Sequence, residues 1–280
     1  MIEIEKSLDS ESPIGTSKIG GRPDLPPYFE WFHYEGEHFE GSTTANRPLS
    51  FIAQINCAEA SKYDTSGLLP QTGMLYFFYD MATNKWGFDP KDKGCAMVSY
   101  YAGDLAELRK TELPADLSSD FHIPEAPVSF SGATELPCFE EFVELCDLSF
   151  AKWNEYDYAR AEFDYVKAEL GYEIDEENDN YEKSKLLGYA DLIQGGMLLG
   201  CELSTNGIYS GDAKIKVTDE EIQQYKKNCK QWQLLFQLGS LDLGDYELMW
   251  GDMGSIYYYI KIDDLKKLKF DDCWLVLQCG

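Results

Sequence analysis

A nine-residue phrase occurs twice in this chain, and the repetition constrains the fold more than any other feature. Residues 17–25 read SKIGGRPDL and residues 184–192 read SKLLGYADL. Both copies carry Ser-Lys at the start, a glycine at the fifth position and Asp-Leu at the end. Similar segments at two distant places in one chain indicate an internal repeat.

Three further pairs of segments follow the two copies in the same order. Each is a short apolar stretch rich in aromatic and branched residues, the composition that β-strands favour. The pairs are LSFIAQIN with WQLLFQLG, GMLYFFYD with GSIYYYIK, and GCAMVSYY with DCWLVLQC, at 49–56 and 232–239, 73–80 and 254–261, and 94–101 and 272–279. Four matches in one order are hard to obtain by chance.

The repeat predicts a fold class. We expect an α+β protein, internally duplicated, with mostly antiparallel sheets built by two pseudosymmetric repeats and with helices inserted between and within them. Most connections are too short for the helical crossover that parallel strands need. We expect a single domain over 1–280, with a first repeat at 17–101, a connecting helical insert at 102–183 and a second repeat at 184–279.

Helical periodicity supports the inserted helices. Apolar residues recur every three or four positions in 134–148 and 152–170, which predicts a helix in each segment. A third helix is expected over 218–230, where Thr218 and Glu221 have the spacing of a capping box. The acidic run at 173–182 is expected to be a solvated loop.

The charge balance excludes some partners and favours others. Fifty acidic residues face 24 basic ones, for a net charge of −26. Such a chain repels nucleic acid and anionic membranes and attracts basic proteins, although solubility alone also explains the charge. No apolar run is long enough to span a membrane, and the acidic N-terminal segment does not resemble a signal peptide, so a cytoplasmic location is expected.

The usual metal-binding and catalytic motifs do not occur. No two of the eight cysteines have CxxC spacing, and they are expected to be reduced and mostly buried. His33 and His38 lie among glutamates but lack helical i, i+4 spacing, so we predict no metal site. Neither a Walker motif nor a GxSxG elbow is present, and no catalytic residue and no cofactor are expected.

The strongest site candidates are the repeated loop and the MWGDMG segment at 249–254. Both combine glycines, which allow close approach of a ligand to the backbone, with charged or aromatic side chains. A site between the repeats would be lined by Arg22, Asp24, Gln54, Tyr189, Asp191, Gln237, Trp250 and Asp252. A purely structural turn explains the same loops, through Gly20, Gly21, Pro23, Gly188 and Gly251.

In combination, these blocks resemble the YwqG-like proteins, a bacterial family of unassigned function. The resemblance rests on SKIGGRPDL, LPQTGMLYFFYD, SKLLGYADLIQG, WQLLFQLGS, MWGDMGSIYYYI and FDDCWLVLQC. It implies an α+β fold with an internal repeat. The chain departs from the family pattern at Ser184, Ala190 and Gly239, where the family often has histidine, proline and an acidic residue. This weakens the case for an enzyme.

Three kinds of function remain open, of which the last is a purely structural or scaffold role. The first is a non-enzymatic bacterial binding protein, for example of the immunity type, whose acidic surface meets a basic protein partner. The alternative is a small-molecule-binding protein or enzyme with its site at the seam between the two repeats. The sequence leaves the oligomeric state open.

Overall fold

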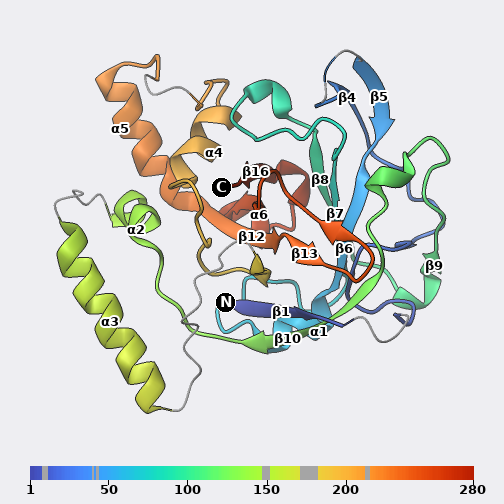
Figure 1. Ribbon diagram of the computed structural model, residues 1–280, viewed down its shortest axis with the longest axis horizontal. Coiled ribbons are helices and arrows are strands. Elements are labelled where there is room, and N and C mark those ends of the chain that lie inside the picture. Colours follow the sequence, from blue (N-terminus) through green and yellow to red (C-terminus); the bar gives the residue numbers. More distant parts are fainter. Residues whose placement is uncertain (8–11, 40, 42–43, 147–151, 171–181, 212–214) are drawn as a thin grey trace.

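A ten-stranded antiparallel sheet forms the frame of the molecule in the computed structural model (Figure 1). The structure describes residues 1–7, 12–39, 41, 44–146, 152–170, 182–211 and 215–280. Two central strands, β1 (Ile2–Lys6) and β10 (Ala126–Gly132), pair with each other along the whole of β1 and residues 128–132 of β10. The acidic run expected as a loop at 173–182 lies almost entirely outside the described residues.

Four strands continue the sheet on each side of the central pair. Beyond β10 the order is β2 (Lys18–Ile19), β6 (Ser50–Asn56), β7 (Met74–Tyr79) and β8 (Ala96–Tyr101). Beyond β1 it is β11 (Lys185–Leu186), β12 (Trp232–Gly239), β15 (Ser255–Lys261) and β16 (Trp274–Gln278). All pairings between described strands are antiparallel, which confirms the α+β class and the expected strand direction.

The sheet curls so that its two flanks face each other. The ring of Phe77 on β7 lies 4.5 Å from that of Phe236 on β12 and 5.1 Å from that of Tyr258 on β15, measured between centroids. The Trp274 indole donates a hydrogen bond to the carbonyl of Gly87 at 2.9 Å, which ties the two flanks together near the edge of the sheet. Because the inner faces pack on each other, the core is shared by the two flanks.

Helices and loops cover the outer faces, so the middle strands of each flank are buried on both sides. This explains why β7 and β15 read as continuous apolar runs rather than as alternating ones. The outer face of the β12–β16 flank contributes Tyr257, Tyr259 and Trp274 to a second core packed against helical segments. The helices are α1 (Cys57–Ala60), α2 (Phe139–Cys146), α3 (Trp153–Glu169), α4 (Leu198–Thr205), α5 (Asp219–Asn228) and α6 (Ile262–Lys266).

The outer face of the β6–β8 flank is covered mainly by loops. Phe29, Trp31 and Phe32 pack there on Phe51 and Phe78. Three small two-stranded sheets lie outside the main sheet: β3 (Asp24–Leu25) with β9 (Arg109–Lys110), β4 (His33–Glu37) with β5 (Thr44–Pro48), and β13 (Leu241–Asp242) with β14 (Glu247–Leu248).

The expected helices form within the segments that periodicity marked. α2, α3 and α5 lie in 134–148, 152–170 and 218–230. The capping box at Thr218 and Glu221 is present with both of its hydrogen bonds, which confirms that prediction. Pro137 precedes α2 by two residues. All eight cysteines are free, and five of them are buried.

Candidate functional site

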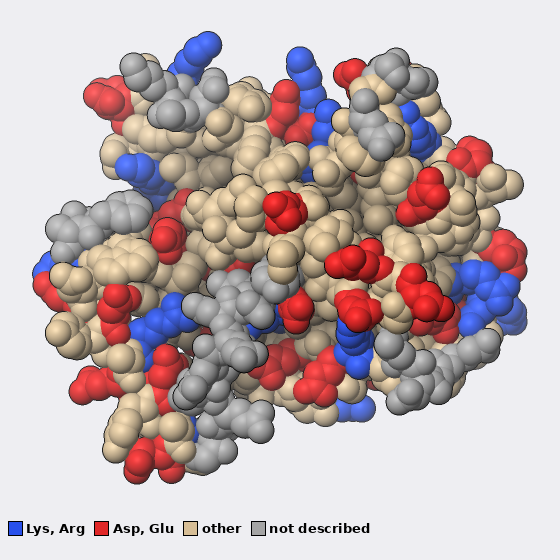
Figure 2. Space-filling model, in the orientation of Figure 1, with Lys and Arg blue, Asp and Glu red and all other residues tan. Residues whose placement is uncertain are grey.

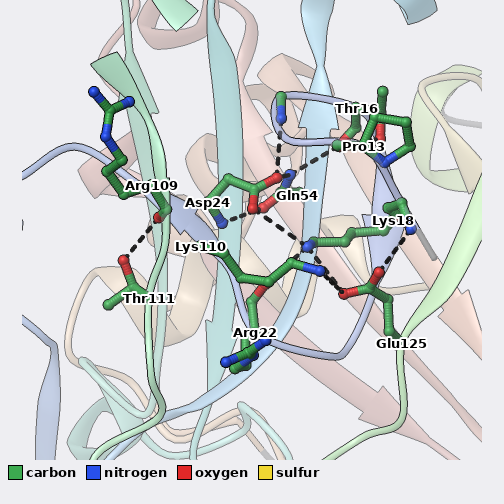
Figure 3. A network of polar contacts seen from close by, with 12 residues as sticks. Pro13, Thr16, Lys18, Arg22, Asp24, Gln54, Arg109, Lys110, Thr111 and Glu125 are labelled. Atoms are coloured by element: carbon green, nitrogen blue, oxygen red, sulfur yellow. Dashed lines mark hydrogen bonds and ion pairs between the residues drawn. The ribbon is translucent and has the colours of Figure 1, made fainter. Parts of the chain in front are cut away.

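The first copy of the repeated phrase forms a buried polar network around Lys18 (Figure 3). The Lys18 ammonium group donates to the carbonyl of Arg22 at 2.7 Å and to the Glu125 carboxylate at 3.1 Å, and it lies 3.5 Å from the Asp24 carboxylate. The Lys18 and Asp24 side chains are both fully buried. An ammonium group has three N–H bonds, so three partners saturate it.

Gln54 on β6 locks Asp24 into the same network. The Gln54 amide oxygen accepts a hydrogen bond from the backbone N–H of Asp24 at 2.8 Å. Its amide nitrogen donates to the Asp24 carboxylate at 2.7 Å and to the carbonyl of Thr16 at 2.8 Å. The Tyr76 hydroxyl donates to the Asp24 carbonyl at 2.5 Å. The Gln54 side chain therefore joins Thr16, just before the repeated phrase, to Asp24 near the end of the phrase.

The second copy repeats these contacts around Lys185. Its ammonium group donates to the Tyr189 carbonyl at 3.2 Å and to the Glu135 carboxylate at 2.7 Å, and pairs with Asp191 at 2.6 Å. The Gln237 amide accepts from the Asp191 N–H at 3.0 Å and donates to the Asp191 carboxylate at 3.0 Å. Gln237 also donates to the Lys183 carbonyl, and the Tyr257 hydroxyl donates to the Asp191 carbonyl.

The repeated glycines have a left-handed backbone conformation. The φ angle is +70° at Gly21 and +76° at Gly188, a region that residues with a side chain rarely adopt. A Cβ atom at either position would also collide with a glutamate side chain, Glu125 or Glu135. Both glycines are therefore required by backbone angle and by space.

A β-bulge lies beside each glycine turn. The pairing register shifts between Phe51 and Ala53 on β6 and between Leu234 and Phe236 on β12. In both places the carbonyl of the intervening residue accepts a hydrogen bond from the turn: Gly20 N–H donates to Ile52 and Leu187 N–H donates to Leu235. Bulges of this kind bend a strand locally, and here they receive the turn of the phrase.

Electrostatics stabilise the charged form of the buried lysine in the second network. Burial alone would lower the pKa of Lys185, but the carboxylates of Asp191 and Glu135 outweigh it and raise the pKa. In the first network, burial opposes ionisation of Glu125, yet the Ser12 N–H and the charge of Lys18 lower the pKa of Glu125 overall. These shifts favour the charged forms of Lys185 and Glu125, which suits a structural clasp.

The structure brings the predicted site residues into two separate clusters rather than one. Asp24 and Gln54 lie in the first network, and Asp191 and Gln237 in the second. Arg22 and Tyr189 join these networks through their carbonyls. The Arg22 guanidinium itself is exposed and pairs with Glu112. Pro23 is buried in the turn before Asp24.

Trp250 and Asp252 lie apart from both networks. The Trp250 ring is buried, donates to the Gly239 carbonyl at 3.1 Å and packs on Tyr79. Asp252 is exposed in the turn after Gly251, whose φ is +63°. Trp250 therefore supports the core at the end of β12.

The histidine-rich hairpin shows no metal geometry. The imidazole of His33 lies 3.0 Å from the Trp31 carbonyl, and His38 stacks on Phe39. Within the described ranges, no group of three histidine, cysteine or acidic side chains could hold a metal ion.

A cleft of about 620 Å³ lies where the two edges of the curled sheet approach each other. Its walls come from the start of β8 on one flank and from β15, β16 and the end of α4 on the other. The charged lining residues are Asp92, Lys93, Lys261, Asp264, Asp271 and Asp272. Trp232 and Trp274 add aromatic surface. Segments far apart in the sequence build this cleft, and no motif marks them.

Four aspartates give the cleft a negative lining. Of its two lysines, Lys261 lies 2.9 Å from the buried carboxylate of Glu202, which also accepts from the Trp232 indole. The charge of Lys261 is therefore already compensated. Burial raises the pKa of Asp92, and Lys85 opposes the shift.

The cleft also contains two cysteines, Cys95 and Cys273. Burial raises the pKa of both thiols well above the usual value, and neighbouring aspartates raise it further. Both thiols therefore stay protonated near neutral pH, where only a thiolate would act as a nucleophile. The cleft is better suited to binding than to cysteine chemistry.

Comparison with known proteins assigns the chain to a family. A family model described as "Domain of unknown function (DUF1963)" matches residues 17–279, and the chain belongs to this family. No curated protein matches the chain. The match agrees with the expectation of an uncharacterised family, and the YwqG-like name stays a prediction. Within the described residues, no helix combines the length and the apolarity that crossing a membrane requires.

Proposed function

We propose that this protein is a non-enzymatic binding protein that receives a cationic group of a basic protein partner in the cleft between the sheet edges. The observation that carries the proposal is the excess of carboxylates in the cleft. Lys261 is held by Glu202 and the buried Asp92 by Lys85, which leaves Asp264, Asp271 and Asp272 against Lys93. The tryptophan surface suits the same ligand, because a lysine or arginine side chain binds favourably to indole faces.

The charge of the whole molecule supports the same partner. The chain has a net charge of −26, and Figure 2 shows carboxylates scattered over the face in view among fewer basic side chains. Such a field attracts a basic protein over a distance of about one Debye length and increases its rate of association. An immunity-type role, in which this protein blocks a basic protein in the bacterial cytoplasm, is the form of the proposal that the acidic surface favours.

A fluorescent hexa-lysine peptide tests the proposal by anisotropy titration at low and at moderate salt. Asp271→Asn combined with Asp272→Asn should weaken binding severalfold, because two exposed charges leave the cleft. The control is Asp157→Asn with Glu162→Gln on α3, which removes the same charge outside the cleft lining. Equal loss in the two double variants would mean that only net charge matters, and the cleft would lose its role.

The second candidate is a small-molecule site at the seam between two repeats. Its support is that the cleft joins the two flanks, and pockets prefer such interfaces. A thermal-shift screen with free polyamines separates the candidates. Stabilisation by a polyamine without any binding of hexa-lysine favours the small molecule.

We also propose that the flanks descend from an internal duplication, with repeats at 17–101 and 184–279 joined by the insert at 102–183. Three correspondences support it: the strand order on each side of β1 and β10, the bulge beside each turn, and the contacts of Lys18 and Lys185. Superposition of residues 17–101 on residues 184–279 tests the proposal. If the corresponding strands do not superpose in the same order, the proposal is wrong.

A further inference from the structure

An aromatic groove lies on the outer face of the β6–β8 flank, apart from the cleft. It has a volume of about 350 Å³ and runs between the loop after β3 and the edge strand β8. Six of its lining residues are aromatic: Tyr28, Phe29, Phe32, Tyr76, Tyr100 and Tyr101. Pro26, Glu30 and Ser99 complete the lining. Tyr28 is 72% exposed, so most of its ring is accessible to a ligand.

Three of the four tyrosine hydroxyls in the groove already donate hydrogen bonds. Tyr76 donates to the Asp24 carbonyl at 2.5 Å, and Tyr100 donates to the Thr72 carbonyl at 2.9 Å. Tyr101 donates to the Glu107 carboxylate at 2.8 Å. Tyr76 is fully buried and Tyr101 nearly so, so what the groove offers a ligand is ring surface of Tyr28, Phe29, Phe32 and Tyr100 rather than hydrogen-bond donors.

The rings are held in place by the core beneath them. Phe29 stacks on Phe78 with centroids 5.7 Å apart and meets Phe32 edge-on at 5.4 Å. Both belong to the cluster packed on the outer face of the flank. An aromatic wall fixed in this way binds a ligand without first losing much conformational entropy.

The charge of the groove is negative. Among the described residues of the lining, Glu30 is the one ionisable residue besides the tyrosines, and the Glu107 carboxylate accepts from Tyr101. Neither lysine nor arginine appears among the described residues that line it. An aromatic wall with carboxylates beside it attracts a cation, whereas a purely apolar ligand would gain nothing from the charge.

We propose that this groove binds the trimethylammonium group of a small soluble molecule. A quaternary ammonium ion has no N–H to donate, so it loses no hydrogen bond when it leaves water for a wall of rings. A primary amine would lose its hydration and would find few free acceptors in the groove. The occupied hydroxyls and the carboxylates together therefore select this class of ligand.

Choline and its uncharged isostere 3,3-dimethyl-1-butanol are the probes for the test. Titration of the full chain is followed by NMR of the aromatic resonances and by calorimetry. Choline should bind, and the isostere, which has the same shape without the charge, should bind at least about 3-fold more weakly, in line with one cation–π contact. Equal affinity of the two probes, or no response to choline up to tens of millimolar, overturns the proposal.

Substitutions at exposed positions test the location of the site without destabilising the fold. Tyr28→Ala should weaken choline binding about 2- to 5-fold, whereas Tyr28→Phe, which keeps the ring, should change it little. Glu30→Gln should also weaken it. Tyr158→Ala and Glu162→Gln on α3 are the matched controls, because these residues are exposed and lie outside the groove lining. Equal effects of Tyr28→Ala and Tyr158→Ala overturn the assignment to this groove.

Phosphatidylcholine vesicles distinguish the source of the group. Sedimentation of the protein with vesicles, without binding of free choline, would overturn the choice of a soluble ligand. The Asp271→Asn, Asp272→Asn variant should bind choline normally, so failure of the proposed cleft and failure of the groove give different results.

Discussion

Replacing the two buried glutamines one at a time tests whether the two lysine networks have equal weight in the fold. The changes are Gln54→Met and Gln237→Met, which preserve side-chain length and volume but remove every hydrogen bond of the amide. Each glutamine makes three such bonds, one accepted and two donated, within a buried network. The two variants are therefore matched in chemistry and in position.

The expected loss follows from the number of bonds. A buried hydrogen bond contributes about 1 kcal/mol net, so each variant should lose about 3 kcal/mol of unfolding free energy. Unfolding entropy near the midpoint is about 2 cal/mol/K per residue, which for 280 residues converts that loss to a decrease in Tm of about 5 °C. We expect the two decreases to agree to within about 1 kcal/mol.

Urea denaturation followed by tryptophan fluorescence measures the loss, and calorimetry gives the change in Tm. Gln223→Met on the exposed surface of α5 is the control and should change stability little. If Gln54→Met is strongly destabilising while Gln237→Met behaves like the control, the networks do not have equivalent roles. The reasoning from matched contacts would then be refuted.

Three further predictions concern single positions. Gly21→Ala and Gly188→Ala should each cost about 1 kcal/mol or more, measured by urea denaturation, because φ is positive and an added Cβ meets a glutamate; a neutral result at either position would contradict the strain. Burial raises the pKa of Glu141 to about 8, so the folded state favours the neutral acid, and stability decreases as pH increases from about 4.5 to about 8. Glu141→Gln should therefore be more stable than the natural chain at pH 9 and similar to it at pH 4. A difference in stability that does not change with pH would show that the pKa of Glu141 is not raised. Thr218→Ala removes the N-cap of α5 and should cost about 1 kcal/mol, with faster amide exchange confined to that helix.

The sequence was sufficient for the parts of the fold that depend on local patterns. Each of the recurring segments contains a strand of the main sheet, as their composition predicted, and the glycines at 21 and 188 lie in turns. The contacts of Asp24 are less local. An aspartate in a turn often bonds the backbone of that turn, but the Asp24 carboxylate accepts from Gln54 and from the N–H of Gly15, nine residues earlier.

Long-range pairing accounts for what the sequence did not reveal. Ala126 on β10 pairs with Ile19, and Ile2 on β1 pairs with Leu186 in the corresponding place. The residues just before these are Glu125 and Met1, and methionine cannot bind an ammonium ion. Glu135, from a different part of the chain, takes that role for Lys185. No spacing rule could have paired Lys185 with a residue 50 positions away.

The cleft and the aromatic groove were missed for a similar reason. The walls of the cleft form only when the sheet curls and brings β8 near the segment that precedes β16, and those of the groove only when the loop after β3 packs beside β8. Curling depends on how bulges, twist and side-chain volumes combine over ten strands. The types of the lining residues do not predict these sites, because tryptophan, aspartate and tyrosine also occur on surfaces that bind nothing.

The central position of β1 has a consequence for how the protein is made. This strand is synthesised long before its two neighbours, residues 126–132 and 185–186. The middle of the sheet therefore stays incomplete on the growing chain until residues 185–186 have been synthesised. At about 5–20 residues per second that interval lasts on the order of ten seconds, during which β1 lacks one or both of its neighbours. Glu3 and Glu5, which alternate with Ile2 and Ile4, keep that strand charged on one face and discourage it from pairing with another chain in the meantime.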